Sequence, residues 1–229
     1  MALWLLLALL LLAGTGYAVT APPSTFTGRG PADFIAWLGP IARDSQIRTG
    51  IPASVVIAQA ALESAWGDSR LIRDTGNAFG VKAGRSWTGR VISATTTEVI
   101  NGVRIRYEGT WRQYVNATAA LADNAHPQTI FRVYPSTLES VRDHARVLYN
   151  GLYERALAHR SNAEAFAYAL EGTYATEPGY GQLVVNVMRG RNLTTWDVPP
   201  EQWQLDASIV PPKHRETWRA AMAARGVSV

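Results

Sequence analysis

An almost continuous run of apolar residues spans positions 51–67, with the sequence IPASVVIAQAALESAWG. Pro52 is typical of the first turn of a helix, and Gly67 is typical of a helix end. Between them no polar face can be drawn, so the run predicts a helix that is buried on all sides. Glu63 is its only charged residue.

The presence of Glu63 in this apolar helix needs a physical explanation, because burying a carboxylate is costly. Desolvation favours the neutral form and raises the pKa of the carboxyl group. A carboxylic acid that stays protonated near neutral pH is what a general acid must be. The alternative is a helix-end glutamate that forms an ion pair with Arg70 or Arg73.

Helical periodicity recurs on both sides of this run. The folded domain is predicted to start near Pro31 with a helix that can kink at Pro40, and Ser136 and Ser161 each begin a capping-box pattern. The apolar positions of the first helix are Phe34, Ile35, Leu38, Ile41 and Ala42. Those of the later helices are Leu138, Val141, Ala145, Leu148 and Leu152, then Phe166, Ala169 and Leu170, then residues 183–188, and finally residues 212–225 with Trp218 as anchor.

Residues 86–107 have a different pattern, rich in β-branched side chains, which predicts strands. Asn101-Gly102 predicts a type I′ hairpin turn in which Glu98 faces Ile105. Alternation places Glu98 on the apolar face and points Arg104 away from it. A strand-end carboxylate is expected to be more exposed than Glu63. Residues 109–128 are hard to assign beyond a short helix over 117–125.

Composition narrows the possible functions. The chain has 229 residues, 47% hydrophobic and 17% charged, and carries no cysteine, which excludes disulfides and thiolate metal sites. The four scattered histidines lack metal-ligand spacing, so each is interpreted as a surface or hydrogen-bonded residue. The formal net charge of +4 suits an acidic polymer, but no basic stripe with interleaved aromatics indicates nucleic acid binding.

The N-terminal segment, residues 1–20, contains ALWLLLALLLLA and is interpreted as a signal peptide or a membrane anchor. Residues 21–30 are predicted to be a linker. The main domain is expected to span 31–196, followed by a tail over 197–229 with one helix.

Five stretches in order, AQAALESAWG, NAFGVKA, WTGRV with TTTEV, FRVYPSTLES and YATEPGY, resemble glycoside hydrolase family 73, the bacterial endo-β-N-acetylglucosaminidases. The resemblance implies an α+β, mainly α, lysozyme-like fold with a helical lobe and a small β-hairpin lobe flanking a glycan groove. It also implies cleavage of the β-1,4 bond after N-acetylglucosamine in peptidoglycan, with no cofactor and no metal.

Family motifs place the general acid on Glu63, a second carboxylate on Glu98 and a catalytic tyrosine on Tyr174. Asn77, Phe79 and Lys82 match a loop expected to support the groove first and to contact substrate second. The remaining candidates for substrate binding are Trp66, Phe131, Tyr134 and Tyr180. Three departures from the family are a shorter loop between Gly67 and Asn77, Glu177 where an aspartate is usual, and a longer stretch over 109–128. The longer stretch puts the groove rim and the position of Glu98 in question.

Two other functions fit the same residues. A muramidase or lytic transglycosylase shares the fold and needs only one catalytic carboxylate. A non-catalytic wall-binding module would bind glycan without cleaving it, but it has little use for both Glu63 and Glu98. The expected partners are therefore peptidoglycan strands, and a membrane through the N-terminal segment. The expected location is the cell envelope of a bacterium, or equally a virion.

Overall fold

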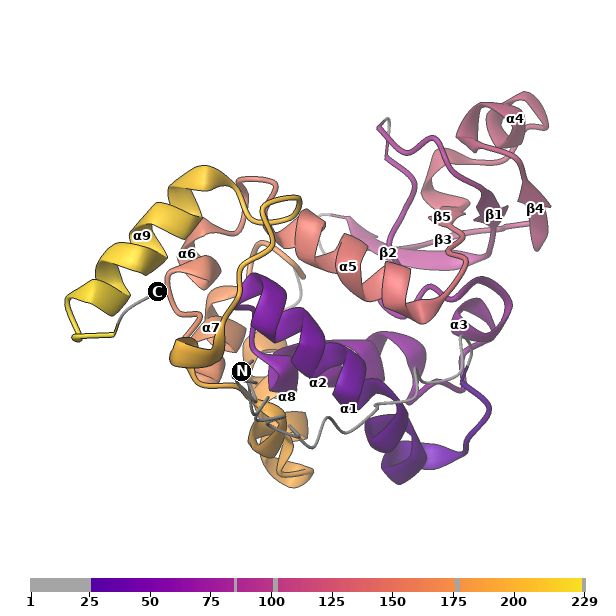
Figure 1. Ribbon diagram of the computed structural model, residues 1–229. Helices are drawn as coiled ribbons and strands as arrows, with labels where there is room; N and C mark the ends of the chain where they lie inside the picture. The colour runs from indigo at the N-terminus through magenta and orange to yellow at the C-terminus, as the bar shows by residue number, and fades with distance from the viewer. Residues whose placement is uncertain (1–25, 85, 101–102, 176–177, 228–229) are drawn as a thin grey trace, which may run out of the picture.

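Helices and two small antiparallel sheets form separate lobes in the computed structural model, which describes residues 26–84, 86–100, 103–175 and 178–227 (Figure 1). The helical lobe contains α1 (Gly30–Thr49), α2 (Ala53–Ser64), α5 (Thr137–Leu148), α6 (Glu154–Leu157), α7 (Ala163–Ala169), α8 (Tyr180–Gly190), α9 (Pro212–Ala223) and the 3₁₀ turns η2 (Leu193–Trp196) and η3 (Pro200–Gln202). The β-lobe contains β1 (Val91–Ser93), β2 (Thr96–Ile100), β3 (Val103–Tyr107), β4 (Arg112–Tyr114), α4 (Ala117–Ala122), η1 (Pro127–Thr129) and β5 (Ile130–Arg132), and α3 (Arg70–Thr75) precedes it. The predicted α+β, mainly α class is confirmed.

Helix α2 is the centre of the helical lobe, in contact with α1, α7 and α8. Residues 53–61 are all buried, which confirms the helix predicted from the apolar run. The helix ends at Ser64 and not at Gly67, because Ala65, Trp66 and Gly67 have φ angles of 51°, 59° and 83°. Such left-handed residues cannot continue a right-handed helix.

The folded core begins earlier than the sequence pattern predicts. Phe26, in the stretch expected to be linker, is buried with its ring centroid 5.5 Å from that of Phe34 and 5.2 Å from that of Trp37. Helix α1 then continues through Pro40. Residues 1–25, including the predicted N-terminal segment, lie outside the described residues, and within the described part no helix is long and apolar enough to cross a membrane.

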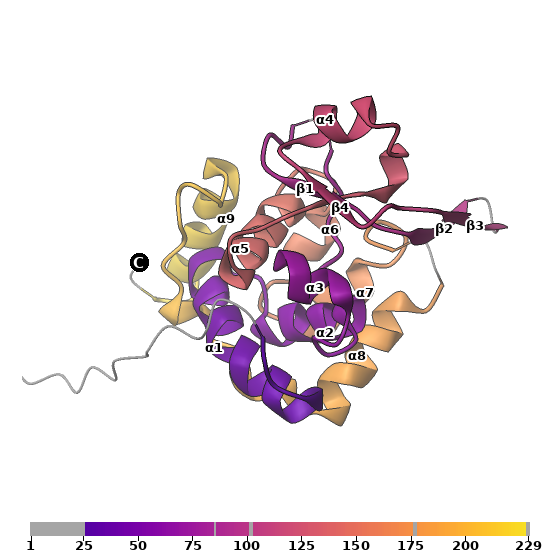
Figure 2. The same cartoon turned by 90° about the vertical axis from the view of Figure 1, so that its right-hand side faces the viewer.

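The β-lobe consists of a three-stranded sheet in the order β4-β1-β5 and the two-stranded hairpin β2-β3. Glu98 pairs with Ile105 as predicted, while the turn residues 101–102 lie outside the described residues. Figure 2 shows the hairpin extending away from the three-stranded sheet. The stretch over 109–128 supplies strand β4 as well as the expected helix α4, so it completes the sheet beside β1.

Capping explains where several helices begin. Ser136 caps α5 by accepting from the Glu139 N–H, as predicted. Helix α7 is capped by Asn162, one residue later than the predicted Ser161, because the Asn162 side chain accepts from the Ala165 N–H. Leu152 is not part of the apolar stripe: α5 ends at Leu148 and Leu152 is exposed.

The C-terminal segment packs on the domain. Helix α9 matches the prediction, and its anchor Trp218 stacks on Trp203 with ring centroids 6.3 Å apart. The Gln204 N–H donates to the Ile47 carbonyl at the end of α1. In Figure 1, α9 lies on the side opposite the β-lobe.

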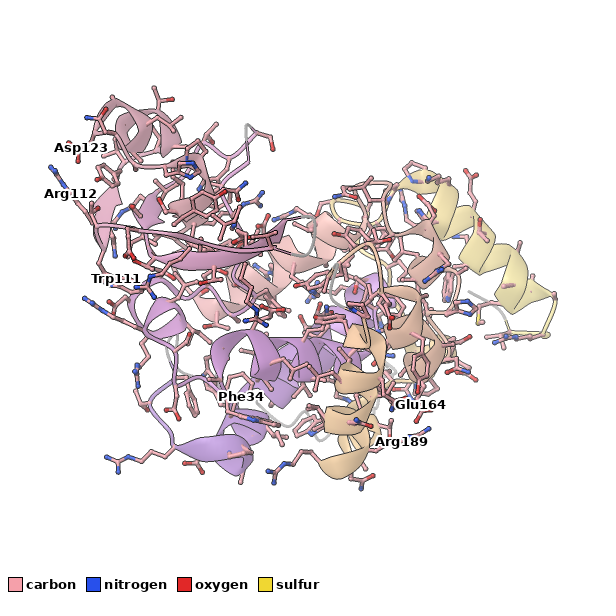
Figure 3. The ribbon with its side chains drawn as sticks, turned by 180° about the vertical axis from the view of Figure 1, so that it is seen from behind. Phe34, Trp111, Arg112, Asp123, Glu164 and Arg189 are labelled. Atoms are coloured by element: carbon pink, nitrogen blue, oxygen red, sulfur yellow. The ribbon has the colours of Figure 1, made fainter. Side chains whose placement is uncertain are left out.

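Figure 3 shows two charge pairs on the surface of the lobes. Arg189 of α8 forms an ion pair with Glu164 of α7, which joins these helices. Arg112 of β4 forms an ion pair with Asp123 after α4, which joins the strand to the helix that follows it. Both pairs are exposed, so each contributes little to stability.

Gly67→Ala should lower the free energy of unfolding by about 2 kcal/mol or more. Left-handed φ costs a non-glycine residue about 1–2 kcal/mol, and overpacking costs about 1–3 kcal/mol. A Cβ on Gly67 would overlap the Phe26 ring and lie 3.0 Å from the Phe34 ring. Urea denaturation measures the change.

Gly151→Ala is the matched control, since Gly151 also has positive φ but nothing lies within 4 Å of its Cβ position. An equal loss in both variants would show that the contact with Phe26 is unimportant.

Candidate active site

Glu63 lies in the last turn of α2, where the enclosed helix reaches the surface. The residue is exposed on one side, while its Oε2 lies 3.9 Å from the Cβ position of Gly80. Tyr180, the first residue of α8, interacts with the same carboxyl group through its hydroxyl. The carboxyl is therefore open to a ligand but surrounded by protein elsewhere.

Desolvation raises the pKa of Glu63 to about 7, and the hydrogen bond from Tyr180 opposes part of this rise. No ion pair joins Glu63 to another described residue. The alternative pairing is contradicted, because Arg70 pairs with Asp74 and Arg73 lies 3.9 Å from Asp68. Glu63 is thus partly protonated at neutral pH, as a general acid requires.

A cluster of tyrosines lies beside this carboxyl. Tyr174 stacks on Tyr180 with ring centroids 5.6 Å apart and is tilted against Tyr153 at 6.2 Å. Burial raises the pKa of both Tyr174 and Tyr180 well above the usual range, so both hydroxyls stay protonated. Tyr180 is buried and begins α8. Gln59, buried on α2, donates to the Tyr180 hydroxyl at 3.0 Å.

Glu98 lies on the hairpin and is held by Lys82. The Lys82 Nζ donates to Glu98 Oε1 at 2.5 Å and to Gln128 Oε1 at 2.8 Å, and the Thr96 hydroxyl donates to the same Glu98 oxygen. The expected order of exposure is reversed: Glu98 is half-buried, with 30% of its side chain exposed, whereas Glu63 is exposed. The ion pair accounts for this, because Lys82 covers the carboxylate.

The loop that carries Lys82 is fixed by Asn77. The Asn77 amide donates to the carbonyls of Val81 and Arg132 and accepts from the Val81 N–H, with the residue 1% exposed. Its hydrogen bonds therefore hold the loop to strand β5. Phe79 of the same loop is also buried, so both residues are placed to support the site.

Phe79 stacks on His144 of α5 with ring centroids 4.0 Å apart. His144 is 1% exposed and neither ring nitrogen has a partner among the described residues, so the expectation of a surface or hydrogen-bonded histidine is wrong here. Burial lowers the pKa of His144 to about 3 and keeps the ring neutral. The neutral ring lies 6.0 Å from the Tyr174 ring, and so extends the aromatic support of the tyrosines.

The other candidates for substrate binding contact different side chains. Phe131 is buried on β5 beneath Lys82, and the Tyr134 hydroxyl donates to Asp143 at 2.6 Å. Trp66 packs against Phe34 and lies under Arg191, which follows α8. Because Tyr180 begins α8 and the helix is about 16 Å long, the Trp66 ring lies near its opposite end.

Sequence reasoning did not single out Gln59, Gln128 or Tyr153 as residues of this site. Gln59 had an available signal, since it precedes Glu63 by one helical turn and so shares its face. Gln128 and Tyr153 had none, because only the fold brings them to Lys82 and Tyr174.

A helical lobe with a desolvated glutamate, facing a small β-lobe that carries a second carboxylate, defines a lysozyme-like domain. Residues 39–193 match the Glucosaminidase family model, described as mannosyl-glycoprotein endo-beta-N-acetylglucosaminidase, and the chain belongs to this family. The resemblance drawn from the motifs is thereby confirmed.

Relatives and solved structures agree with this assignment. Peptidoglycan hydrolase FlgJ of Salmonella typhimurium is 34% identical over 162 residues, 69% of this chain and 45% of FlgJ. A probable N-acetylmuramidase of Lactococcus lactis is 34% identical over 173 residues, 72% of this chain and 34% of that protein. A peptidoglycan hydrolase mutant from Sphingomonas sp. A1 superposes with a TM-score of 0.55 at 32% identity, covering 72% of this chain and 97% of that one. The chain thus spans half or less of these curated relatives.

Glu63→Gln should stabilise the fold increasingly as pH rises from about 4.5 to about 7. A carboxyl whose folded pKa exceeds its unfolded value binds protons more tightly in the folded state, so wild-type stability falls across this window. Glutamine does not titrate, and the gap in melting temperature between variant and wild type should widen and then level off above pH 7.

Glu108→Gln is the control, because the hydrogen bond from Arg106 lowers the pKa of Glu108. Removing the Glu108 carboxylate should therefore destabilise the fold, which is the opposite of the effect expected for Glu63→Gln. A gap that does not change with pH for Glu63→Gln would contradict the raised pKa.

Proposed function

We propose that this domain is a peptidoglycan hydrolase that cleaves the β-1,4 bond after N-acetylglucosamine, with Glu63 as the general acid. One observation carries the proposal: Glu63 has no ion pair within the described residues, and desolvation holds its pKa at about 7 while one side stays open to solvent. Family membership and the peptidoglycan hydrolases among the relatives support the substrate class.

Glu63 would protonate the oxygen of the leaving sugar, and positive charge would develop on the other sugar. Glu98, the acetamido group of the substrate, or both would stabilise that charge. Tyr174 would orient the acetamido group, since its hydroxyl is kept protonated and can donate. The pair between Lys82 and Glu98 supports a sequence of events in which glycan binding brings the hairpin carboxylate to its working distance.

The contacts of the supporting residues indicate a different role for each group of them. Tyr180 is proposed to contact the site directly, because its hydroxyl is hydrogen-bonded to Gln59, one helical turn before Glu63, while Lys82 is proposed to place Glu98. Asn77 and Phe79 are proposed to support the loop. Trp66, Phe131 and Tyr134 are proposed to bind sugars of the glycan strand.

The substrate implies a location in the cell envelope, or on a virion that must breach one. We propose that residues 1–20 export or anchor the domain, because an apolar run of this composition favours either outcome. The described domain includes Phe26, which packs in its core.

A muramidase is the second candidate function, favoured by the 34% identity to the probable N-acetylmuramidase of Lactococcus lactis. It would use the same acid on the neighbouring bond of the same polymer. The two reactions leave different sugars at the new reducing end.

Glu63→Gln should lower the rate of peptidoglycan hydrolysis by about 10²- to 10⁴-fold or more, because the amide cannot act as an acid. Glu98→Ala should cost less, because the acetamido group of the substrate can take over part of its task. Release of soluble glycan from purified walls at one pH measures both variants.

Glu108→Ala is the matched control on the same hairpin, since Glu108 is exposed and paired with Arg106. It should keep wild-type activity. Near-normal turnover of Glu63→Gln would exclude the assigned acid, and a Glu98 variant as inactive as the Glu63 variant would exclude the division of labour.

A further inference from the structure

Gln59 is a fully buried amide that uses only part of its hydrogen-bonding capacity. Its Nε2 donates to the Tyr180 hydroxyl at 3.0 Å, whereas its Oε1 has no partner among the described residues. A leucine or methionine would fill the same space without an unpaired polar atom. A buried acceptor without a partner destabilises the fold. The presence of an amide at this position therefore needs a functional explanation, and the hydrogen bond that its nitrogen donates can provide one.

The positions of the three side chains supply that reason. Gln59 and Glu63 are one turn apart on α2 and therefore lie on the same face of the helix. Tyr180 begins α8, which packs against α2, and its hydroxyl accepts from Gln59 at 3.0 Å on the face of α2 that also carries Glu63. The tyrosine ring is itself fixed by stacking on Tyr174.

Hydrogen-bond directions follow from counting protons. A tyrosine hydroxyl has one proton to donate, and its oxygen can accept. Since the oxygen accepts from Gln59, the proton remains free to point to another acceptor, and the Glu63 carboxyl is the one beside it. An amide nitrogen is solely a donor, so Gln59 cannot attract that proton in this orientation.

We propose that Gln59 is a positioning residue whose amide directs the Tyr180 hydroxyl proton onto the Glu63 carboxyl, stabilising the carboxylate that forms when Glu63 gives up its proton. This inference rests on the proposed function of Glu63. In the reaction the Glu63 proton moves to the glycosidic oxygen, and the bond from that oxygen to the anomeric carbon breaks with its electron pair on the oxygen. Water then adds to the anomeric carbon, and one of its protons restores the acid.

The hydrogen bond from Tyr180 has its largest effect in the transition state, where negative charge develops on the Glu63 carboxyl. The bond from Tyr180 is worth more to the carboxylate than to the acid, because hydrogen bonds to ionised groups are the stronger ones. It therefore favours proton release in the transition state over the ground state. It also keeps the pKa of Glu63 from rising further through desolvation, so the acid remains matched to neutral pH.

The test is a ¹³C NMR titration of the Glu63 side-chain carboxyl in the free protein, which needs no catalysis. Tyr180→Phe should raise the pKa by about one unit, as loss of a hydrogen bond to a charged group predicts. Gln59→Met, which preserves volume, should raise it by about half as much. In the Tyr180→Phe background Gln59→Met should add nothing, because its influence passes through that hydroxyl.

Tyr168→Phe is the matched control. Its hydroxyl donates to the Gln182 side chain at 3.0 Å, on the surface between α7 and α8, so its removal should leave the Glu63 titration unchanged. In peptidoglycan hydrolysis the alkaline limb of the pH–rate profile should move upward with the NMR value, which loss of packing alone would not produce. Should the wild type fail to cleave peptidoglycan, the proposed function falls, and the titration still decides the hydrogen-bond chain.

A second measurement covers the case in which Gln59→Met does not fold. The side-chain amide resonance of Gln59 in the wild type should shift with the protonation of Glu63, and Tyr180→Phe should abolish this response. The proposal would be overturned if the chemical shift of the Gln59 amide did not change as Glu63 titrates. It would also be overturned if Gln59→Met still shifted the pKa of Glu63 in the absence of the Tyr180 hydroxyl.

Discussion

Desolvation of the Glu63 carboxyl depends on how α2 is enclosed. Helices α1, α7 and α8 pack around it, and residues 53–61 are buried. The helix ends one residue beyond Glu63, where Ala65, Trp66 and Gly67 adopt left-handed φ and turn the chain away. The same enclosure places Tyr180 on the carboxyl and Gln59 behind it. Removing this packing would let water reach the acid from all sides and return its pKa to an ordinary value.

The second carboxylate is positioned by a different kind of interaction. Glu98 stands on a hairpin whose neighbouring side chains are partly exposed, so its place is set by polar contacts with Lys82 and Thr96. Lys82 in turn depends on a loop fixed by Asn77. One acid is thus fixed by apolar packing and the other by hydrogen bonds, and hydrogen bonds of partly exposed groups rearrange more readily when a ligand competes for them.

Local patterns in the sequence predicted the parts of the site that depend on local rules. A single charge in an apolar run identified Glu63, and alternation beside Asn101-Gly102 gave the pairing of Glu98 with Ile105. The bond from Lys82 to Glu98 was not predictable, because it depends on how the loop and hairpin meet in space.

Short elements were also missed, for a related reason. Helices as short as α3 and α6 are marginal alone and form because tertiary contacts hold them. Strand β4 is largely polar and exists through its pairing with β1. The ring nitrogens of His144 have no partner among the described residues, against the usual rule for buried polar groups, and no sequence pattern predicts this.

The most direct test of the account is the chemical identity of the new chain ends. Residues 22–229 would be incubated with purified peptidoglycan, and the products would be reduced with borohydride and analysed by mass spectrometry. The account predicts reduced N-acetylglucosamine at the new ends, absent when Glu63→Gln is used. Reduced muramic acid, its anhydro form, or unchanged glycan would contradict it.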